Sequence, residues 1–394
     1  MHIKPLGIGV VGTGDISNAY LGNLSRYDDI VRLVAVADMN TERAKQKARQ
    51  YSIAATYSSV DELVKDPSVD IVLNLTPPAA HATVTLTALK AGKHVYSEKT
   101  IATTLEDGQE ILDLAKANGL TVGCAPDTIL GGRLQEAIEL IDSGKIGEIT
   151  GGVASAVFPG LEWFHASPVF YYGEGVGPLP DLGPYYLAAL IATLGPVARV
   201  TGLAKKTYQQ RLVHSEPMKG TVIDVEAPTY VTALLEFESG SIVTFLISWD
   251  IWDSQLPRME FYGTKGTICL PDLDPLEGPN IFGGPLWLKT TESSRFVYLP
   301  RPEVDMNWES VELHHPFTET SHAQNSRGIG LIDMAYALQE GRAPRLSAEM
   351  GFHVLEVCTA ITKAAQEKCF VEVKSTCNRP EQMPIDFPKG KPRA

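Results

Sequence analysis

Short apolar runs alternate with stretches of helical spacing along the first 125 residues of the chain. The runs are rich in Val, Ile and Leu, which is typical of buried strands, and the stretches between them are typical of helices. The predicted strands are one containing Ile8, Val10 and Val11, then Val31–Ala37, Asp70–Thr76, His94–Glu98 and Leu120–Ala125, and the predicted helices are Asn18–Leu24, Asn40 or Thr41 to Tyr51, Asp61–Lys65, Ala79–Ala91 and Leu105–Asn118. This alternation predicts an α/β domain with a parallel sheet covered on both faces.

The pattern changes near Pro126, after which strand signals dominate. A helix over Gly131–Ser143 is followed by predicted strands at Thr150–Phe158, Val197–Lys205, Thr229–Glu238, Ser241–Ile251 and Arg258–Tyr262, and by helices at Gly328–Glu340 and Met350–Glu367. Ser239-Gly240 is typical of a hairpin turn. We therefore expect two domains, residues 1–126 and residues 127–394, the second built on a mostly antiparallel sheet.

Three segments outside these elements are rich in Pro or Gly. The connections at 207–228 and 271–285 are candidates for loops that cover a substrate or contact another subunit. The tail from Asn378 carries four prolines and is expected to be extended.

Composition narrows the class of protein. The chain has 394 residues, 44% of them hydrophobic, and a net charge of −13, which argues against nucleic acid as a partner. We identify no signal peptide and no apolar run long enough to cross a membrane, so we expect a cytoplasmic protein. The five cysteines are scattered without zinc-site spacing, so we expect reduced thiols and no metal.

The first predicted strand leads directly into Gly12-Thr13-Gly14, and a helix follows. Strand, glycine turn and helix form a dinucleotide-binding pattern, in which Gly12 permits the turn and Gly14 lets the backbone approach a pyrophosphate. Ser17 takes the third position, where a small side chain lets the helix pack on the strand. An ordinary strand-to-helix turn is the alternative for the glycines alone. Asp38, about 20 residues further on, favours the dinucleotide interpretation because its carboxylate would accept the ribose hydroxyls.

Two positions could contribute catalytic side chains. Lys99 ends a strand at the edge of the sheet where ligands of open α/β folds bind, although a solvated lysine is the alternative. Asp181 and Tyr185 are four residues apart in a helix predicted from Asp181 to Leu194, so they share one face and could bind one small molecule together. The alternative is that Asp181 caps the helix and Tyr185 lies in the core.

Aromatic and hydrogen-bonding residues gather in a predicted loop that contains Glu162-Trp163-Phe164-His165, Tyr171 and Tyr172. Such a mixture suits stacking on a sugar ring, but loop packing would explain it equally well.

Five motifs together carry a family resemblance. They are the glycine-rich entry at Gly7–Ser17, Leu75–His81 (Leu-Thr-Pro-Pro-Ala-Ala-His), Ala91–Lys99 (Ala-Gly-Lys-His-Val-Tyr-Ser-Glu-Lys), Gly144–Ile149 and Asp181–Tyr185 (Asp-Leu-Gly-Pro-Tyr). In this order they resemble the glucose-fructose oxidoreductase / inositol dehydrogenase family, and Tyr262–Gly266 with the closing helices extends the resemblance over nearly the whole chain. The resemblance implies a Rossmann domain, a second domain with a large open sheet, a homodimer or homotetramer, and hydride transfer between a nicotinamide cofactor and a sugar or polyol.

The resemblance also implies which residues form the site. Lys99 matches the lysine of the family's Glu-Lys-Pro motif, Asp181 its substrate-binding aspartate, and Tyr185 a position held by a catalytic His or Tyr. An ammonium beside a phenol lowers the pKa of the phenol, so Lys99 would help Tyr185 to act as a base. Cofactor-binding residues are expected to be Gly12, Thr13, Gly14, Asp15, Ile16, Asp38, Met39, Arg43, Thr76, Pro77, Pro78, His81, Glu98 and Lys99, and substrate-binding residues Lys99, Trp163, His165, Asp181 and Tyr185.

Thr100 departs from the family pattern, which has proline after the lysine. A cis bond before a residue other than proline costs about 2.5 to 4 kcal/mol, so we expect a trans peptide between Lys99 and Thr100.

The sequence thus predicts an NAD-dependent dehydrogenase for a secondary alcohol of a sugar, glycoside or polyol. NAD is favoured over NADP because Asp38 would repel a 2′-phosphate and its neighbours Met39 and Asn40 supply no cation, although Arg43 lies close in sequence. Two alternatives remain: an NADP-linked keto-sugar reductase, and a non-catalytic sensor or repressor of the same fold. The presence of Lys99, Asp181 and Tyr185 argues against the sensor.

Overall fold

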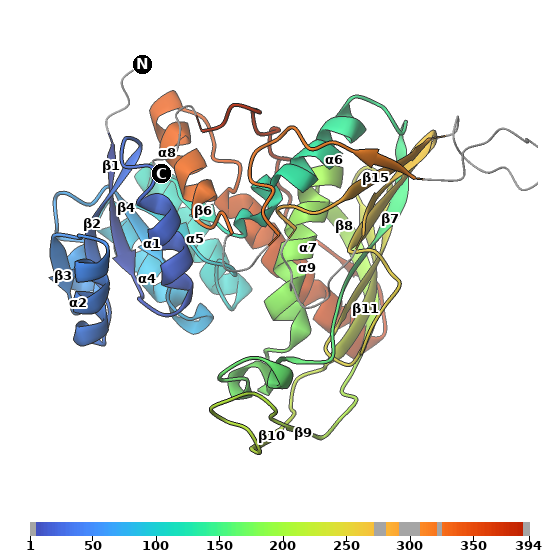
Figure 1. The fold of residues 1–394 in the computed structure, drawn as a ribbon, viewed down its shortest axis with the longest axis horizontal. Coiled ribbons are helices and arrows are strands. Elements are labelled where there is room, and N and C mark those ends of the chain that lie inside the picture. The colour runs from blue at the N-terminus through green and yellow to red at the C-terminus, as the bar shows by residue number, and fades with distance from the viewer. Residues whose placement is uncertain (1–4, 272–280, 291–307, 321–324, 389–394) are drawn as a thin grey trace, which may run out of the picture. The chain divides into compact units, whose positions relative to one another are not determined.

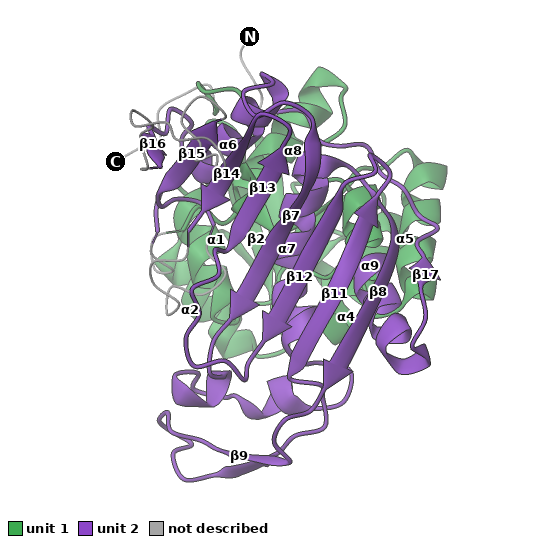
Figure 2. Cartoon of the chain, turned by 90° about the vertical axis from the view of Figure 1, so that its right-hand side faces the viewer, with its two compact units in different colours: residues 1–131, 323–355, 383–394 green, residues 132–322, 356–382 purple. Residues whose placement is uncertain are grey.

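The computed structural model describes residues 5–271, 281–290, 308–320 and 325–388. Two compact units emerge, and each is made of several segments of the chain. Unit 1 comprises residues 1–131, 323–355 and 383–394, and unit 2 comprises residues 132–322 and 356–382 (Figure 2). The functional domain boundary at 126/127 stays a prediction.

Unit 1 is built on a parallel sheet with the strand order β3-β2-β1-β4-β5-β6, six strands among the described residues (Figure 1). This is the order of doubly wound dinucleotide-binding domains. Its elements are β1 (Leu6–Val11), α1 (Ile16–Leu24), β2 (Val31–Ala37), α2 (Thr41–Gln50), β3 (Ala55–Tyr57), α3 (Val60–Leu63), β4 (Ile71–Asn74), α4 (Pro78–Lys90), β5 (His94–Ser97), α5 (Leu105–Asn118), β6 (Val122–Cys124), a 3₁₀ turn (Asp127–Leu130) and α8 (Ile329–Glu340).

Both faces of this sheet are covered, as the apolar runs predicted. Side chains alternate along each strand, so Ile8 and Val10 of β1 face one side and Val11 faces the other. On one side α1 lies beside α8, and on the other α3, α4 and α5 bury a core that includes Val72 and Ile111. Because helices cover both faces, a ligand is expected at the edge of the sheet, where loops follow the carboxyl ends of β1, β2, β4 and β5.

Unit 2 contains a sheet with the order β16-β15-β14-β13-β7-β12-β11-β8-β17, nine strands in the described part of the chain. The strands are antiparallel except for the parallel pair β7–β12. The elements are α6 (Gly132–Asp142), β7 (Ile149–Val157), 3₁₀ turns (Leu161–Trp163 and Val169–Tyr172), α7 (Pro178–Leu194), β8 (Val197–Lys205), β9 (Gln210–Leu212), β10 (Val222–Asp224), β11 (Tyr230–Phe237), β12 (Ile242–Ser248), β13 (Met259–Gly263), β14 (Gly266–Leu270), β15 (Leu286–Thr290), β16 (Glu309–Val311) and β17 (Val371–Glu372). The helix α9 (Ala348–Glu367) crosses from unit 1 into unit 2.

Only one face of the unit 2 sheet is covered by helices among the described residues. Helix α7 packs against β7, β11 and β12, and its neighbour α6 packs on α7. Figure 2 looks onto the opposite face of the sheet. The alternation of buried and exposed positions along β8, β11 and β12 places Leu203, Leu234 and Ile242 on that face.

The predicted fold class is confirmed, and most predicted elements occur within a few residues of their expected ends. The connection at 207–228, expected to be irregular, contains the short pair β9 and β10. Residues 272–280 of the second connection and 389–394 of the tail lie outside the described residues. Within the ranges the structure describes, no helix has the length and apolar character needed to span a bilayer.

Candidate functional site

The turn after β1 requires glycine at its first position. Gly12 has a φ of +95°, and a Cβ there would lie 2.7 Å from the carbonyl oxygen of Leu75. A side chain would therefore be disfavoured by backbone conformation and by the neighbouring strand at once. The predicted strand, glycine turn and helix are present, with Ser17 buried on α1 and its hydroxyl bonded to the carbonyl of Gly14 at 2.7 Å.

Gly14 has a different role, because a Cβ built there meets no atom of the described chain within 4 Å. The space beside it is open, as expected where a phosphate must approach the backbone. Helix α1 begins at Ile16 directly after Asp15, and within the described ranges no side chain caps its N-terminus. A helix N-terminus without a side-chain cap and an open glycine are features that suit a pyrophosphate, so the residues fit a dinucleotide.

Asp38 lies at the end of β2, beside the glycine turn. Its Oδ2 accepts hydrogen bonds from the Thr13 backbone N–H (2.8 Å) and hydroxyl (2.6 Å), and its Oδ1 accepts the Asn40 N–H (2.8 Å). The Arg43 guanidinium contacts both oxygens at 3.0 and 3.1 Å. Burial alone would raise the pKa of Asp38, but the bonds from Thr13, Asn40 and Arg43 outweigh it and hold that pKa below the ordinary value.

A second group of predicted cofactor residues follows β4. The hydroxyl of Thr76 donates to the Asn74 side chain at 2.6 Å, and the ring nitrogens of His81 lie 2.8 Å from the Thr76 carbonyl oxygen and 2.6 Å from that of Thr100. His81 is buried, and burial lowers the pKa of its ring although both carbonyls oppose that shift. Between these two residues, Pro77 is the N-cap of α4 and Pro78 is its first residue.

The expected trans peptide between Lys99 and Thr100 is wrong, because the bond is cis. The expectation weighed only the local preference of the peptide bond. The sequence did not show the contact between the Thr100 carbonyl and the His81 ring at 2.6 Å. The Thr100 hydroxyl also donates to the nearby carbonyl of Ala102 at 2.8 Å.

Glu98 and Lys99 follow β5 at the carboxyl edge of the sheet, as predicted. Glu98 is buried and accepts the backbone N–H of Lys99 at 2.9 Å and the hydroxyl of Tyr20 at 2.8 Å. Lys99 is half-buried. Tyr20 and Asp127, 3.0 Å apart through their side-chain oxygens, were not identified from the sequence because they lie 107 residues apart.

In unit 2, Asp181 and Tyr185 lie on α7, which begins three residues before the predicted start. Gly177, with a φ of +89°, occupies the N-cap, so Asp181 is in the first turn and is not the cap. Tyr185 is 7% exposed and Asp181 is half-buried. The cap alternative is therefore wrong, and the burial of Tyr185 is compatible with either of its two interpretations.

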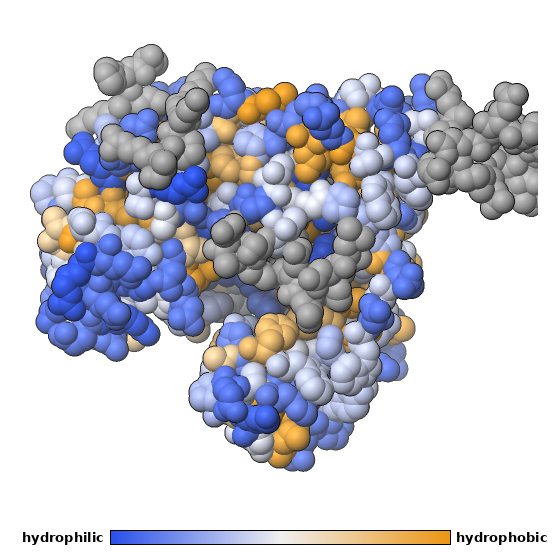
Figure 3. Space-filling view, in the orientation of Figure 1, coloured by the Kyte–Doolittle hydropathy of each residue, from blue (hydrophilic) through white to orange (hydrophobic). Residues whose placement is uncertain are grey.

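The aromatic loop of unit 2 forms an exposed group of rings. Trp163 stacks on His214 with centroids 3.8 Å apart and planes 3° apart, and Trp252 meets Trp163 edge-on at 5.4 Å. His165 packs edge-on against Tyr171 at 5.0 Å. Trp163 and Trp252 are 42% and 67% exposed, and Figure 3 shows apolar surface on the lobe that carries β9 and β10 in Figure 1.

A buried ion network that the sequence did not reveal supports this loop. Arg211 of β9 contacts the carboxylates of Glu162 and Asp250 and donates to the carbonyls of Pro159 and Trp249, both at 2.9 Å. Because Glu162 precedes Trp163, the network fixes the backbone that presents the exposed indole.

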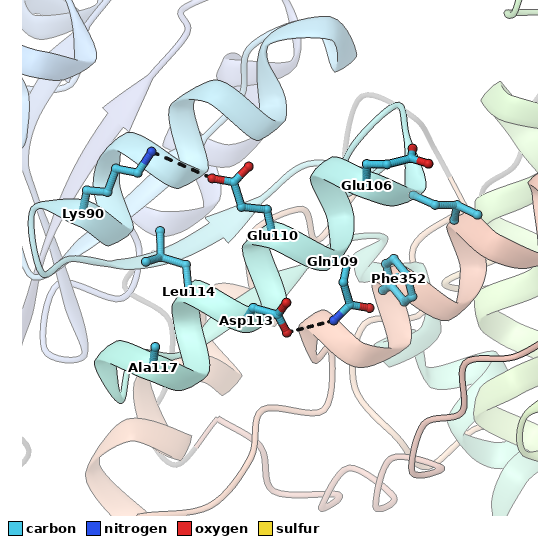
Figure 4. A pocket seen from close by; sticks show the side chains of 9 residues that line it. Lys90, Glu106, Gln109, Glu110, Asp113, Leu114, Ala117 and Phe352 are labelled. Carbon is cyan, nitrogen blue, oxygen red and sulfur yellow. Dashed lines mark hydrogen bonds and ion pairs between the residues drawn. The ribbon is translucent and has the colours of Figure 1, made fainter.

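An open pocket of about 770 Å³ lies elsewhere on unit 1, along α5 (Figure 4). Its wall includes a Lys90–Glu110 ion pair at 3.9 Å and a Gln109–Asp113 hydrogen bond at 2.9 Å, with Phe352 of α9 at one end. The pocket contains none of the residues predicted to bind cofactor or substrate.

Comparison with known proteins gives two matches to family descriptions. Residues 6–125 match "Oxidoreductase family, NAD-binding Rossmann fold", and residues 134–269 match "GFO/IDH/MocA C-terminal domain". D-glucoside 3-dehydrogenase of Escherichia coli is 26% identical over 281 residues, which cover 68% of this chain and 78% of that protein. Inositol 2-dehydrogenase of Azotobacter vinelandii is 35% identical over 147 residues, 36% of this chain and 43% of that protein.

Among solved structures, levoglucosan dehydrogenase in complex with NADH and L-sorbose superposes with a TM-score of 0.77 and 18% identity, over 94% of this chain and 99% of that one. At this identity the likeness concerns the fold. The two family matches follow one another along the chain, and both sheets have the topology expected of the family. The chain is an NAD(P)-binding oxidoreductase of the GFO/IDH/MocA family.

Proposed function

We propose that the protein is an NAD-dependent dehydrogenase that oxidises a secondary alcohol of a sugar, glycoside or polyol. The observation that carries the proposal is the turn after β1, where Gly14 leaves open space at the start of α1 and Asp38 lies beside it. Residues 1–126 would bind the cofactor, and residues 127–394 would bind substrate and form the subunit contacts.

Cofactor binding is assigned to three groups of residues in unit 1. The backbone from Gly12 to Ile16 would bind the pyrophosphate, Asp38 the adenosine ribose, and the residues near Pro77, His81 and Lys99 the nicotinamide end. The nicotinamide supplies the hydride acceptor when it is bound.

The proton and the substrate are assigned to three side chains. Tyr185 takes the proton of the reacting hydroxyl, and Asp181 and Lys99 bind the substrate and orient it. The spacing of Asp181 and Tyr185 on α7 supports this division, because residues at i and i+4 share one helix face.

A carbohydrate substrate is supported by two kinds of observation. Two relatives described above are a D-glucoside 3-dehydrogenase and an inositol 2-dehydrogenase. In unit 2, the exposed Trp163, held by the Arg211 network, offers an aromatic ring to the apolar face of a sugar, and His165 offers a hydrogen-bonding group nearby.

Arg43 favours one alternative, an NADP-linked keto-sugar reductase. Its guanidinium forms an ion pair with the Asp38 carboxylate and is nearly half-exposed, so it could also meet a 2′-phosphate. NAD remains the proposed cofactor because Asp38 keeps its charge beside the glycine turn. We also propose a cytoplasmic homodimer or homotetramer.

The test is to measure NAD reduction with a panel of sugars, inositols and glycosides. Variants of the enzyme are then assayed with the best substrate. Tyr185→Phe should lower kcat about 10²-fold or more, since it removes the proton acceptor and keeps the ring. Asp181→Asn should act mainly on KM, and Lys99→Met on both constants.

Tyr186→Phe is the matched control. Tyr186 is the next residue of α7, fully buried, and its hydroxyl accepts a hydrogen bond from Arg258 at 2.9 Å. Its loss should lower the melting temperature and leave kcat per folded molecule intact. A Tyr185→Phe enzyme that behaves in this way would contradict the proposed mechanism.

A further inference from the structure

Two carboxyl groups and a tyrosine form a continuous buried row behind Lys99 in unit 1. The Tyr20 hydroxyl oxygen lies 2.8 Å from Oε1 of Glu98 and 3.0 Å from Oδ2 of Asp127. All three side chains are buried, with exposed fractions of 0% for Tyr20, 7% for Glu98 and 0% for Asp127.

The hydrogens available within this row are too few if both carboxyls are ionised. A tyrosine hydroxyl has a single hydrogen, and an ionised carboxylate only accepts. With two carboxylates, one of the two oxygen–oxygen contacts would join a lone pair to a charged oxygen with no hydrogen between them. In a buried site this is costly, whereas one additional proton satisfies both contacts.

The surroundings indicate which carboxyl carries that proton. Arg327 approaches Oε1 of Glu98 at 3.5 Å, and the adjacent Lys99 donates its backbone N–H to Oε2. Burial would raise the pKa of Glu98, but the charges of Arg327 and Lys99 and the Tyr20 hydrogen bond hold it below its ordinary value. Glu98 is therefore the anion of the pair.

Asp127 keeps all its contacts when it is neutral. Its Oδ1 accepts the Tyr96 hydroxyl and the Gly330 N–H, both at 2.7 Å, and its Oδ2 can accept the Gly328 N–H at 3.1 Å while donating a proton to Tyr20. Burial raises the pKa of Asp127 in spite of Arg327 and these donors.

The other titratable groups around the row do not change their protonation state, so they do not account for the additional proton. Burial, followed by the charge of Asp127, raises the pKa of Tyr20 and of Tyr96. Burial also raises the pKa of the Cys124 thiol on β6, and Glu98 and Asp127 raise it further. These groups stay protonated and leave the two carboxyls as the variable members.

We propose that Asp127, Tyr20 and Glu98 form a directed chain of hydrogen bonds in which Asp127 is a neutral acid, Tyr20 donates to Glu98, and Glu98 is the sole anion. Tyr20 and Asp127 are then positioning residues that fix Glu98 and, through its bond to the backbone N–H, the Lys99 segment. The positioning role rests on the proposed function of Lys99, whereas the protonation of Asp127 does not.

Infrared spectroscopy tests the protonation directly on the full-length wild-type protein at pH 7. Labelling of aspartate with ¹³C should shift a carbonyl band of a protonated carboxyl, and the band should be absent from Asp127→Asn. The band should remain in Asp333→Asn, which replaces another fully buried carboxylate of unit 1, paired with Arg345 at 2.5 Å. A wild-type protein without a label-sensitive band of this kind would overturn the proposal.

Stability provides an independent measurement that needs no activity. If the pKa of Asp127 in the folded state lies above its unfolded value of about 3.9, the protonated group stabilises the fold. This stabilisation is complete below the unfolded pKa and is lost as pH rises through the folded pKa. From pH 4.5 upward, the folding constant of the wild type relative to Asp127→Asn should therefore fall, by up to tenfold per pH unit. A wild-type to Asp127→Asn ratio that is constant or rises with pH would overturn the proposal.

The positioning role is tested with Tyr20→Phe against Tyr57→Phe. Tyr57 also donates to a carboxylate of unit 1, Asp66 at 3.1 Å, but it lies away from β5. Tyr20→Phe should lower kcat/KM about tenfold or more and keep NADH binding, since it removes a hydrogen bond to a charged group. Tyr57→Phe should not. Equal kcat/KM in the two variants would overturn the positioning role, and an inactive wild type would refute the proposed function while the infrared result still decides the protonation.

Discussion

Gly12 and Gly14 differ in what a methyl group would meet, and this difference separates folding from cofactor binding. Gly14→Ala should leave the free energy of unfolding nearly unchanged, because the added Cβ touches nothing in the described chain, and should weaken NADH binding. A side chain in a left-handed conformation costs about 1 to 2 kcal/mol. Gly12→Ala should lower the free energy of unfolding by more than that, because the added Cβ also meets the Leu75 carbonyl.

Gly92→Ala is the control for the conformational part alone, since Gly92 has a φ of +76° and no neighbour within 4 Å of a Cβ in the described structure. Urea unfolding and NADH fluorescence titration measure the two effects. Wild-type NADH affinity in Gly14→Ala would show that the phosphate does not approach this backbone.

We expect the cofactor preference to depend on Asp38 and Arg43 together. We expect kcat/KM to be higher with NAD than with NADP, because the carboxylate of Asp38 keeps its charge beside the turn. Arg43→Ala should increase that preference, since it removes the cation nearest to a 2′-phosphate, and Asp38→Ala should reduce it.

Arg49, an exposed residue in the last turn of α2, serves as the control for a general loss of positive charge. Steady-state kinetics with both cofactors decide the matter. Comparable or better kcat/KM with NADP in the wild type would contradict the preference for NAD.

Local chemistry made some site residues predictable and left others hidden. The glycine turn, Asp38 and Lys99 come soon after strands, and hydrophobic patterning identifies strands well. Tyr20 and Asp127 are ordinary residues in sequence and meet only because α1, β5 and the segment after β6 converge in the fold. The cis peptide at Thr100 was likewise missed, since the packing of its carbonyl against His81 follows from the fold.

Among the elements, the long buried strands and helices were predicted best. Val31–Ala37 and Val197–Lys205 occur with the predicted bounds because continuous apolar or alternating patterns define them. The pair β9 and β10 was missed because each strand has three residues, too few for a period to register. The buried ion pairs of Arg211 hold this pair in place, and no local sequence pattern predicts those ion pairs.

That buried arginine makes the β9 segment a sensitive element of unit 2. Arg211→Met should lower the free energy of unfolding by about 3 to 5 kcal/mol, because Glu162 and Asp250 would remain buried without a counter-charge. Arg199→Met is the matched control, since Arg199 pairs with Glu236 at 2.7 Å in the same unit but both side chains are well exposed. It should cost much less than Arg211→Met, because water screens an exposed ion pair. Equal losses in urea unfolding would show that the network does not anchor the loop.

At the scale of the whole molecule, the face of the unit 2 sheet that no described helix covers exposes apolar side chains. Leu203 on β8, Leu234 on β11 and Ile242 on β12 are 64%, 46% and 54% exposed, and the strands that carry them are neighbours. Figure 2 shows this face without a described helix over it. Contiguous apolar surface of this kind marks an interaction site, and an isologous pairing would bury it against its own copy.

We therefore expect a homodimer or homotetramer, with a mass by light scattering at micromolar concentration that is a multiple of 42.8 kDa. Leu234→Lys should dissociate it, because a pairing face would have to bury an unpaired ammonium from each subunit. Val222→Lys is the control: Val222 is 56% exposed on β10, outside this sheet, and its replacement should leave the mass unchanged. A monomeric wild type would refute assembly, and an oligomer that survives Leu234→Lys but not Val222→Lys would move the interface from the sheet to the β9–β10 lobe.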